Sequence, residues 1–323
     1  MYLDHFGLSQ APFKLSPDPG YLYLSSQHRL GLSLLRYGLS EAGGGLTVIT
    51  GAVGAGKTTL LRKLLQEIDY DHLTVGIINN TLNFDEHLIH WVASAFELSY
   101  EGKEGIVVFR EFQQYLIQQY SRGKQTILIV DEAQNLREES LEELRLLTNI
   151  NAEHDQLLKI ILVGQPELLA MLTKPKLAQI AQRVSVEYHL DTLSREETAN
   201  YIRHRMQVAG ASVDVFDESS LAAVYALSAG VPRLINTLCD QALVFGFAME
   251  KNHIDIHAIL EVCKGRRIGG LNHHDRNKAA VIETQRWIKE NYEIDLMQEL
   301  RGPEAFAAEE AAPSPVNLVP VGN

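Results

Sequence analysis

The sequence predicts an α/β fold in which a parallel β-sheet is followed by a small α-helical domain and a helical extension. A glycine-rich segment, residues 51–58, directly follows an apolar run at 46–50. A second apolar run, 126–130, ends in two carboxylates. Apolar, strand-length runs alternate with helical patterns as far as residue 190. This alternation is typical of a parallel sheet with helical crossovers.

The glycine-rich segment has the pattern G-x-x-x-x-G-K-[ST] of a phosphate-binding loop (P-loop), between a strand-like run and a helical run. Its glycines let the backbone turn N–H groups toward phosphates, Lys57 can reach the β and γ phosphates, and the Thr58 hydroxyl can bind Mg²⁺. The residues predicted to bind the nucleotide are Gly51, Ala52, Val53, Gly54, Ala55, Gly56, Lys57, Thr58 and Thr59.

The apolar run 126–130 is predicted to be a central strand that is buried on both faces. Asp131 and Glu132 follow it directly, where a charged group is costly unless it has a partner. We expect Asp131 to hold Mg²⁺ through water, together with Thr58, and Glu132 to polarise the attacking water. This pair therefore completes a nucleotide-hydrolysis site.

Five apolar runs are predicted to form the sheet: residues 46–50, 73–78, 126–130, 157–163 and 184–190. Helical patterns near 59–65, 86–96, 106–120 and 141–150 lie between them. Every crossover is then helical, as right-handed βαβ connections require.

Beyond residue 190 the pattern is purely helical. Residues 194–197 form a capping box that opens one helix, and Asp217 can cap the next. Pro232 is placed where a first helical turn tolerates proline, and a fourth helix begins near Asp255. An amphipathic helix is predicted from 276 to 300, and the proline-containing tail 301–323 is predicted to be disordered.

The formal net charge is −12, which argues against broad electrostatic wrapping of nucleic acid. No apolar run has the length of a membrane span, and the N-terminus lacks the pattern of a signal peptide, so a cytoplasmic location is expected. The two cysteines, Cys239 and Cys263, lie in helical context and are predicted to be core residues.

The order of P-loop, carboxylate pair, further strand and helical lid is the layout of AAA+ ATPases. Over residues 1–265 the chain resembles the ExeA, or general secretion pathway protein A, family. The motifs that carry this resemblance are Tyr2–Leu8, Pro12-Phe13, Pro17–Leu24, Asp131–Gln134, Val163–Leu168 and Gly230–Asn236.

The resemblance implies ATP as the nucleotide and roles for three further residues. Gln165 would be the sensor 1 group that orients the attacking water, and Arg233 would be the sensor 2 group that contacts the γ-phosphate. Arg183 would be an arginine finger for a neighbouring subunit of a homo-oligomer, although a surface arginine paired with a local carboxylate is the alternative. The segment 13–24 would cover the adenine or serve only in packing.

The predicted organisation follows from these assignments. It consists of an N-terminal segment on the adenine side (1–45), the P-loop AAA+ domain (46–190), the helical lid (191–265), the helical extension (266–300) and the tail (301–323). Secretion-type members of the family continue into a membrane span and a peptidoglycan-binding domain, which this sequence lacks. A direct role at the cell wall is therefore not expected.

Two functions remain open at this point. In the favoured one, ATP hydrolysis drives assembly or regulation of a secretion, pilus or exopolysaccharide-export system, with protein partners recruiting the chain to the inner face of the membrane. The helix that carries Trp287 is expected to dock on such a partner. In the alternative, the protein is a DNA-associated ATPase that regulates transposition or a related transaction, but no basic DNA-reading module is visible.

Overall fold

The computed structural model describes residues 1–16, 19–40, 43–79, 87–152, 155–264 and 278–300. The chain divides into two compact units. The sheet unit comprises Ser16–Thr192 and Val231–Arg233, and the helical unit comprises Met1–Leu15, Leu193–Gly230 and the described residues from Leu234 onward. The predicted domain boundaries remain predictions. Residues 265–277, at the start of the predicted extension, and the predicted disordered tail 301–323 lie outside the described residues.

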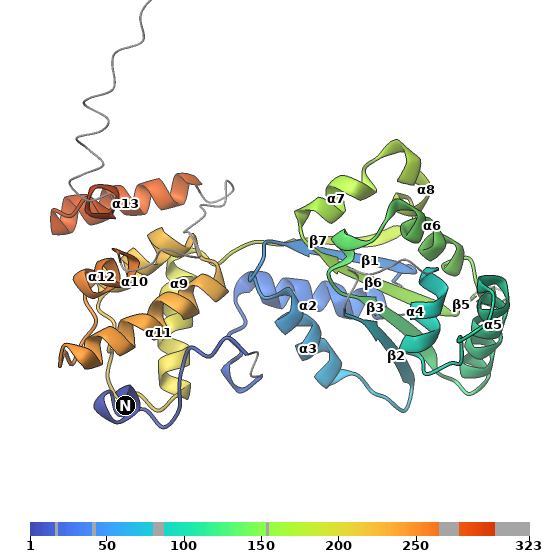
Figure 1. Cartoon of the computed structure of the whole chain (residues 1–323), viewed down its shortest axis with the longest axis horizontal. Coiled ribbons are helices and arrows are strands. Elements are labelled where there is room, and N and C mark those ends of the chain that lie inside the picture. Colours follow the sequence, from blue (N-terminus) through green and yellow to red (C-terminus); the bar gives the residue numbers. More distant parts are fainter. Residues whose placement is uncertain (17–18, 41–42, 80–86, 153–154, 265–277, 301–323) are drawn as a thin grey trace, which may run out of the picture. The chain divides into compact units, whose positions relative to one another are not determined.

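The sheet unit is built on five parallel strands in the order β2-β3-β6-β1-β7 (Figure 1). Their bounds are β1 Leu46–Gly51, β2 Leu73–Ile78, β3 Gln125–Val130, β6 Leu158–Gly164 and β7 Val184–Leu190. The predicted parallel sheet is therefore confirmed. A small antiparallel pair, β4 (Asn151–Ala152) and β5 (Asp155–Gln156), was not predicted.

Helices cover both faces of this sheet, which explains why its central strands are continuously apolar. Ile127 and Ile129 of β3 pack in a core with α2 (Ser26–Leu39) and α3 (Lys57–Glu67). Leu128 and Val130 pack in the core on the other face. That second core includes α4 (Leu88–Ala95), α5 (Gly105–Ser121), α6 (Glu138–Leu147), α7 (Pro166–Leu172) and α8 (Ala178–Ala181). Successive residues of a strand point to opposite faces of the sheet. Since both faces are covered, the residues on both faces of a central strand must be apolar.

One lysine interrupts the apolar run of β6. Lys159 is buried, and its Nζ atom donates to the carbonyl oxygens of Gly38, Ser40 and Gly43 at the end of α2. A helix C-terminus offers unpaired carbonyl groups and a partial negative charge, so it can stabilise a buried ammonium group. This lysine therefore attaches the end of α2 to the centre of the sheet.

The helical unit contains α1 (Tyr2–His5), α9 (Arg195–Val208), α10 (Glu218–Ser228), most of α11 (Pro232–Ala248), α12 (Ile256–Lys264) and α13 (Lys278–Tyr292). The predicted capping box is confirmed. The Ser194 hydroxyl accepts from the Glu197 N–H at 3.1 Å, and the Glu197 carboxylate accepts from the Ser194 N–H at 3.2 Å. Among the described residues, no helix combines the length and apolar character needed to cross a bilayer.

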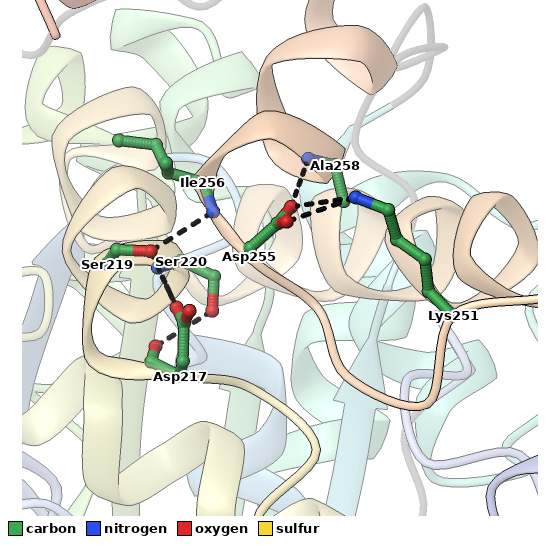
Figure 2. A network of polar contacts seen from close by, with 7 residues as sticks. All are labelled: Asp217, Ser219, Ser220, Lys251, Asp255, Ile256 and Ala258. Atoms are coloured by element: carbon green, nitrogen blue, oxygen red, sulfur yellow. Dashed lines mark hydrogen bonds and ion pairs between the residues drawn. The ribbon is translucent and has the colours of Figure 1, made fainter. Parts of the chain in front are cut away.

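A polar network joins the first turns of α10 and α12 (Figure 2). Asp217 caps α10 as predicted, because its carboxylate accepts from the Ser220 N–H at 2.8 Å. It also accepts from the Ser219 hydroxyl at 2.7 Å, and Ser219 in turn accepts from the Ile256 N–H at 3.1 Å. Asp255 caps α12. The two helix starts are thus fixed to each other by side chains that satisfy otherwise unpaired N–H groups.

The apolar face of α13 packs against α10 within the helical unit. Val281 and Ile288 are buried, and the Arg195 guanidinium lies 3.8 Å from the centre of the Trp287 ring. The helix predicted to run from 276 to 300 is interrupted after Tyr292, where Glu293 adopts a left-handed conformation with φ = 58°, and residues 296–300 are helical again. The apolar face of the helix that was expected to dock on a partner therefore covers α10 of its own chain.

Replacing a core residue of α13 should destabilise the helical unit. Ile288 is 0% exposed, so Ile288→Ala should lower the free energy of unfolding by about 2–5 kcal/mol. Ile282 on the same helix is 48% exposed, so Ile282→Ala should change it little. Urea unfolding followed by Trp287 fluorescence in a Trp91→Phe background would measure both. Equal stability of the two variants would contradict the packing of α13.

Candidate nucleotide-binding site

The carboxyl ends of three neighbouring strands carry the predicted site residues. The P-loop follows β1, Asp131 and Glu132 follow β3, and Gln165 follows β6, which lies between them. Strand pairing aligns Thr50 with Gly164 and Val130 with Leu162. Since all three strands are parallel, residues far apart in sequence meet at one edge of the sheet.

Two P-loop glycines have backbone conformations that other residues rarely adopt. Gly54 has φ = 79° and Gly56 has φ = 106°. A Cβ atom at Gly56 would also lie 2.6 Å from Nε2 of His28, a buried side chain whose Nδ1 is 2.8 Å from the Ser25 hydroxyl oxygen. Ser25 and His28 could not be identified from the sequence, which shows only an ordinary helix start at these positions.

Lys57 lies inside the P-loop and is only 7% exposed. Its Nζ atom donates to the carbonyl oxygens of Gly51 at 2.7 Å and Ala52 at 3.0 Å. Burial lowers the pKa of Lys57, while the carboxylates of Glu132 and Asp131 oppose this shift. The ammonium group is thus placed where phosphate oxygens would replace lost hydration.

The two predicted metal ligands are in direct contact. The Thr58 hydroxyl donates to Oδ2 of Asp131 at 3.1 Å. Burial raises the pKa of Asp131, and the Glu132 N–H and the Thr58 hydroxyl oppose this shift. A hydroxyl and a carboxylate are oxygen ligands of the kind that Mg²⁺ prefers beside nucleotide phosphates, so the residues present fit this ion. Within the described ranges, no cluster of three or more histidine, cysteine or acidic side chains suggests another metal site.

Glu132 is held by two side-chain amides. Its Oε2 atom accepts from Nε2 of Gln134 at 2.7 Å, and Nε2 of Gln165 lies at 3.4 Å. The structure therefore brings Gln165, the predicted sensor, next to the predicted base. Gln134 is the last residue of the motif Asp131–Gln134, and the motif alone predicted no role for it.

Arg233 lies against the P-loop. Its backbone N–H donates to the carbonyl oxygen of Gly54 at 3.3 Å, and a Cβ atom at Gly54 would lie 2.6 Å from that of Arg233. Its position agrees with the predicted sensor 2 role, which remains a prediction.

Arg183 precedes β7 and lies at the opposite edge of the sheet. Strand pairing aligns Leu46 with Val184 and Gly51 with Leu190, so the length of β7, about 20 Å, separates Arg183 from its own P-loop. Its guanidinium donates to the Thr148 carbonyl oxygen at 3.4 Å and to the side chain of Asn149. This position is incompatible with a role in the nucleotide site of the same subunit.

Phe13, part of the segment with an open assignment, is buried in the helical unit. Its ring makes an edge-to-face contact with Phe216, with ring centres 6.0 Å apart. Packing therefore accounts for this end of the segment.

This fold and this arrangement of residues define a P-loop protein of the AAA+ class. A family model described as "AAA domain" matches residues 40–172. The chain is 42% identical over 255 residues to General secretion pathway protein A from Aeromonas hydrophila. The match covers 79% of this chain and 46% of that protein, so the chain spans about half the length of this relative. The predicted resemblance is confirmed, and the chain is an ExeA-like AAA+ protein.

Solved structures support the fold alone. Cdc6p from Pyrobaculum aerophilum has a TM-score of 0.58 and 16% identity, and the match covers 93% of this chain and 88% of that chain. A Drosophila ORC structure has a TM-score of 0.56 and 13% identity, with 95% and 81% covered. At such identities the likeness extends to the architecture and not to activity.

Neutralising Asp131 should stabilise the nucleotide-free protein at neutral pH. Because its folded-state pKa is raised, the stability that this group contributes is present at low pH and is lost as the pH rises through that pKa. Asp131→Asn should therefore raise the Tm at pH 7, and the difference should shrink toward the ordinary aspartate pKa of about 3.9. Thermal melts across pH would measure this, with the exposed Asp71→Asn as control. A lower Tm for Asp131→Asn at pH 7 would contradict the assigned cost of burial.

Proposed function

We propose that this protein binds ATP with Mg²⁺ and hydrolyses it. The observation that carries the proposal is the contact between Thr58 and Asp131, which joins the P-loop to the carboxylate pair. P-loop NTPases hold Mg²⁺ with these two residue types. Residues 51–59 would surround the phosphates, with Lys57 supplying positive charge.

In the proposed mechanism, Glu132 accepts a proton from the attacking water and Gln165 helps to orient that water. Bound Mg²⁺ would neutralise part of the negative charge on the phosphates. Arg233 contacts the γ-phosphate from within the same subunit, and Arg183 reaches the nucleotide of a neighbouring subunit in a homo-oligomer. The contact between Gln165 and Glu132 and the distance of Arg183 from its own P-loop support these roles.

We propose further that ATP turnover serves assembly or regulation of a secretion, pilus or polysaccharide-export system in the cytoplasm, through protein partners at the inner face of the membrane. The identity to General secretion pathway protein A supports this. DNA as a partner is not favoured, because a net charge of −12 opposes broad electrostatic contact with a nucleic-acid backbone. Strong, salt-sensitive stimulation of ATP hydrolysis by duplex DNA would reverse this choice.

Two substitutions should separate binding from chemistry. Lys57→Ala removes the charge beside the phosphates and should abolish ATP binding. Glu132→Gln keeps the shape of the side chain and should bind ATP while hydrolysing it about 100-fold or more slowly, because it lacks the base. Affinity for a fluorescent ATP analogue and phosphate release would measure the two effects. Wild-type affinity in Lys57→Ala would contradict the site assignment.

Mixing two inactive variants should restore some activity if Arg183 acts between subunits. Arg183→Ala supplies an intact Glu132, and Glu132→Gln supplies an intact Arg183, so a mixed interface can contain both. An arginine finger contributes about 10³–10⁵ in rate, so the recovered turnover should be measurable. Turnover per subunit should also rise with protein concentration. Hydrolysis that is independent of concentration, without recovery on mixing, would contradict an arginine-finger role for Arg183.

A further inference from the structure

Gln134 contacts the proposed base, but the mechanism above gives it no role. It lies in η2 (Ala133–Asn135), the short helix that directly follows Glu132. Its Nε2 atom donates to Oε2 of Glu132 at 2.7 Å, and its Oε1 atom accepts from the backbone N–H of Gln165 at 2.9 Å. One amide thus joins the residue after β3 to the residue after β6.

Each end of the Gln134 amide contacts a group that can take only one role in a hydrogen bond, either donor or acceptor. An ionised carboxylate oxygen only accepts, and a backbone N–H only donates. The orientation of the Gln134 amide is therefore determined by its partners. A carboxylate at this position could accept from Gln165 but could not donate to Glu132, and an apolar side chain could do neither.

The backbone around this contact is shaped to allow it. Glu132 has φ = 54°, a left-handed conformation that is unfavourable for a residue other than glycine. This turn directs η2 toward the end of β6. At that end, a Cβ atom on Gly164 would lie 2.9 Å from Oε1 of Gln134 and 3.2 Å from its backbone N. The left-handed turn at Glu132 and the absence of a side chain at Gly164 thus together allow Gln134 to reach the backbone of Gln165.

We propose that Gln134 is a positioning residue that holds the Glu132 carboxylate in line with the attacking water and fixes it to the end of β6. The inference rests on the proposed ATPase function. Gln134 would act through Glu132 and would not touch the nucleotide. Because proton transfer requires hydrogen-bond geometry, a displacement of about 1 Å can reduce the rate about 100-fold.

Two variants of the 323-residue chain test this role. Gln134→Met keeps the length of the side chain but removes both hydrogen bonds. Gln134→Glu keeps the shape and the bond from Gln165 but places a second carboxylate against Glu132. Asn135→Ala is the matched control, because Asn135 is exposed in the same short helix. For each variant we would measure the affinity for a nonhydrolysable ATP analogue, the Tm and kcat.

For Gln134→Met we expect kcat to fall about 10–100-fold while the affinity and the Tm stay near those of the wild type. Gln134→Glu should lose at least as much, and Asn135→Ala should match the wild type. A crystal structure of Gln134→Met should show the Glu132 side chain displaced. A kcat near the wild-type value in either Gln134 variant would overturn the proposal, and so would a parallel loss of affinity, Tm and kcat.

The wild type and Glu132→Gln separate this inference from the proposed function. If the wild type does not hydrolyse ATP, or Glu132→Gln hydrolyses it normally, the proposed function fails and the role of Gln134 fails with it. If Glu132→Gln is inactive but Gln134→Met is fully active, only the role of Gln134 fails.

Discussion

Three adjacent strands, β3, β6 and β1, run parallel and end at the same edge of the sheet, and the candidate site depends on this alignment. The carboxylate pair follows β3, Gln165 follows β6, and the P-loop follows β1. None of these parts is unusual alone. A register shift of one residue between β3 and β6 would move Glu132 away from Gln165, because side chains alternate between the two faces of a strand.

The site also contains charged side chains, Lys57 and Asp131, that are buried away from water. Burial acts in opposite directions on its two central groups, lowering the pKa of Lys57 and raising that of Asp131. Each group partly offsets the cost of burying the other. Such an arrangement reduces the stability of the empty protein but leaves charged groups that a nucleotide and its metal ion can pair with.

Local patterns in the sequence predicted the features that depend on neighbours along the chain. The apolar run 126–130 indicated a strand buried on both faces, and the P-loop motif located Lys57 and Thr58. The contact of Gln134 could not be predicted, because it depends on the left-handed turn at Glu132 and on Gly164, which is 30 residues away along the chain. The contact of α13 with α10 could not be predicted for a similar reason, because an amphipathic pattern shows that a face is covered but not by what.

The two cysteines have a practical consequence for studying this protein. Cys239 and Cys263 are both buried in the helical unit, and burial raises the pKa of the Cys239 thiol well above its usual range. Burial shields both thiols from alkylating dyes, and Cys239 in addition forms little thiolate. A cysteine introduced at an exposed position of the sheet unit away from the P-loop, such as Ile117 in α5, could carry a label without prior removal of the native thiols.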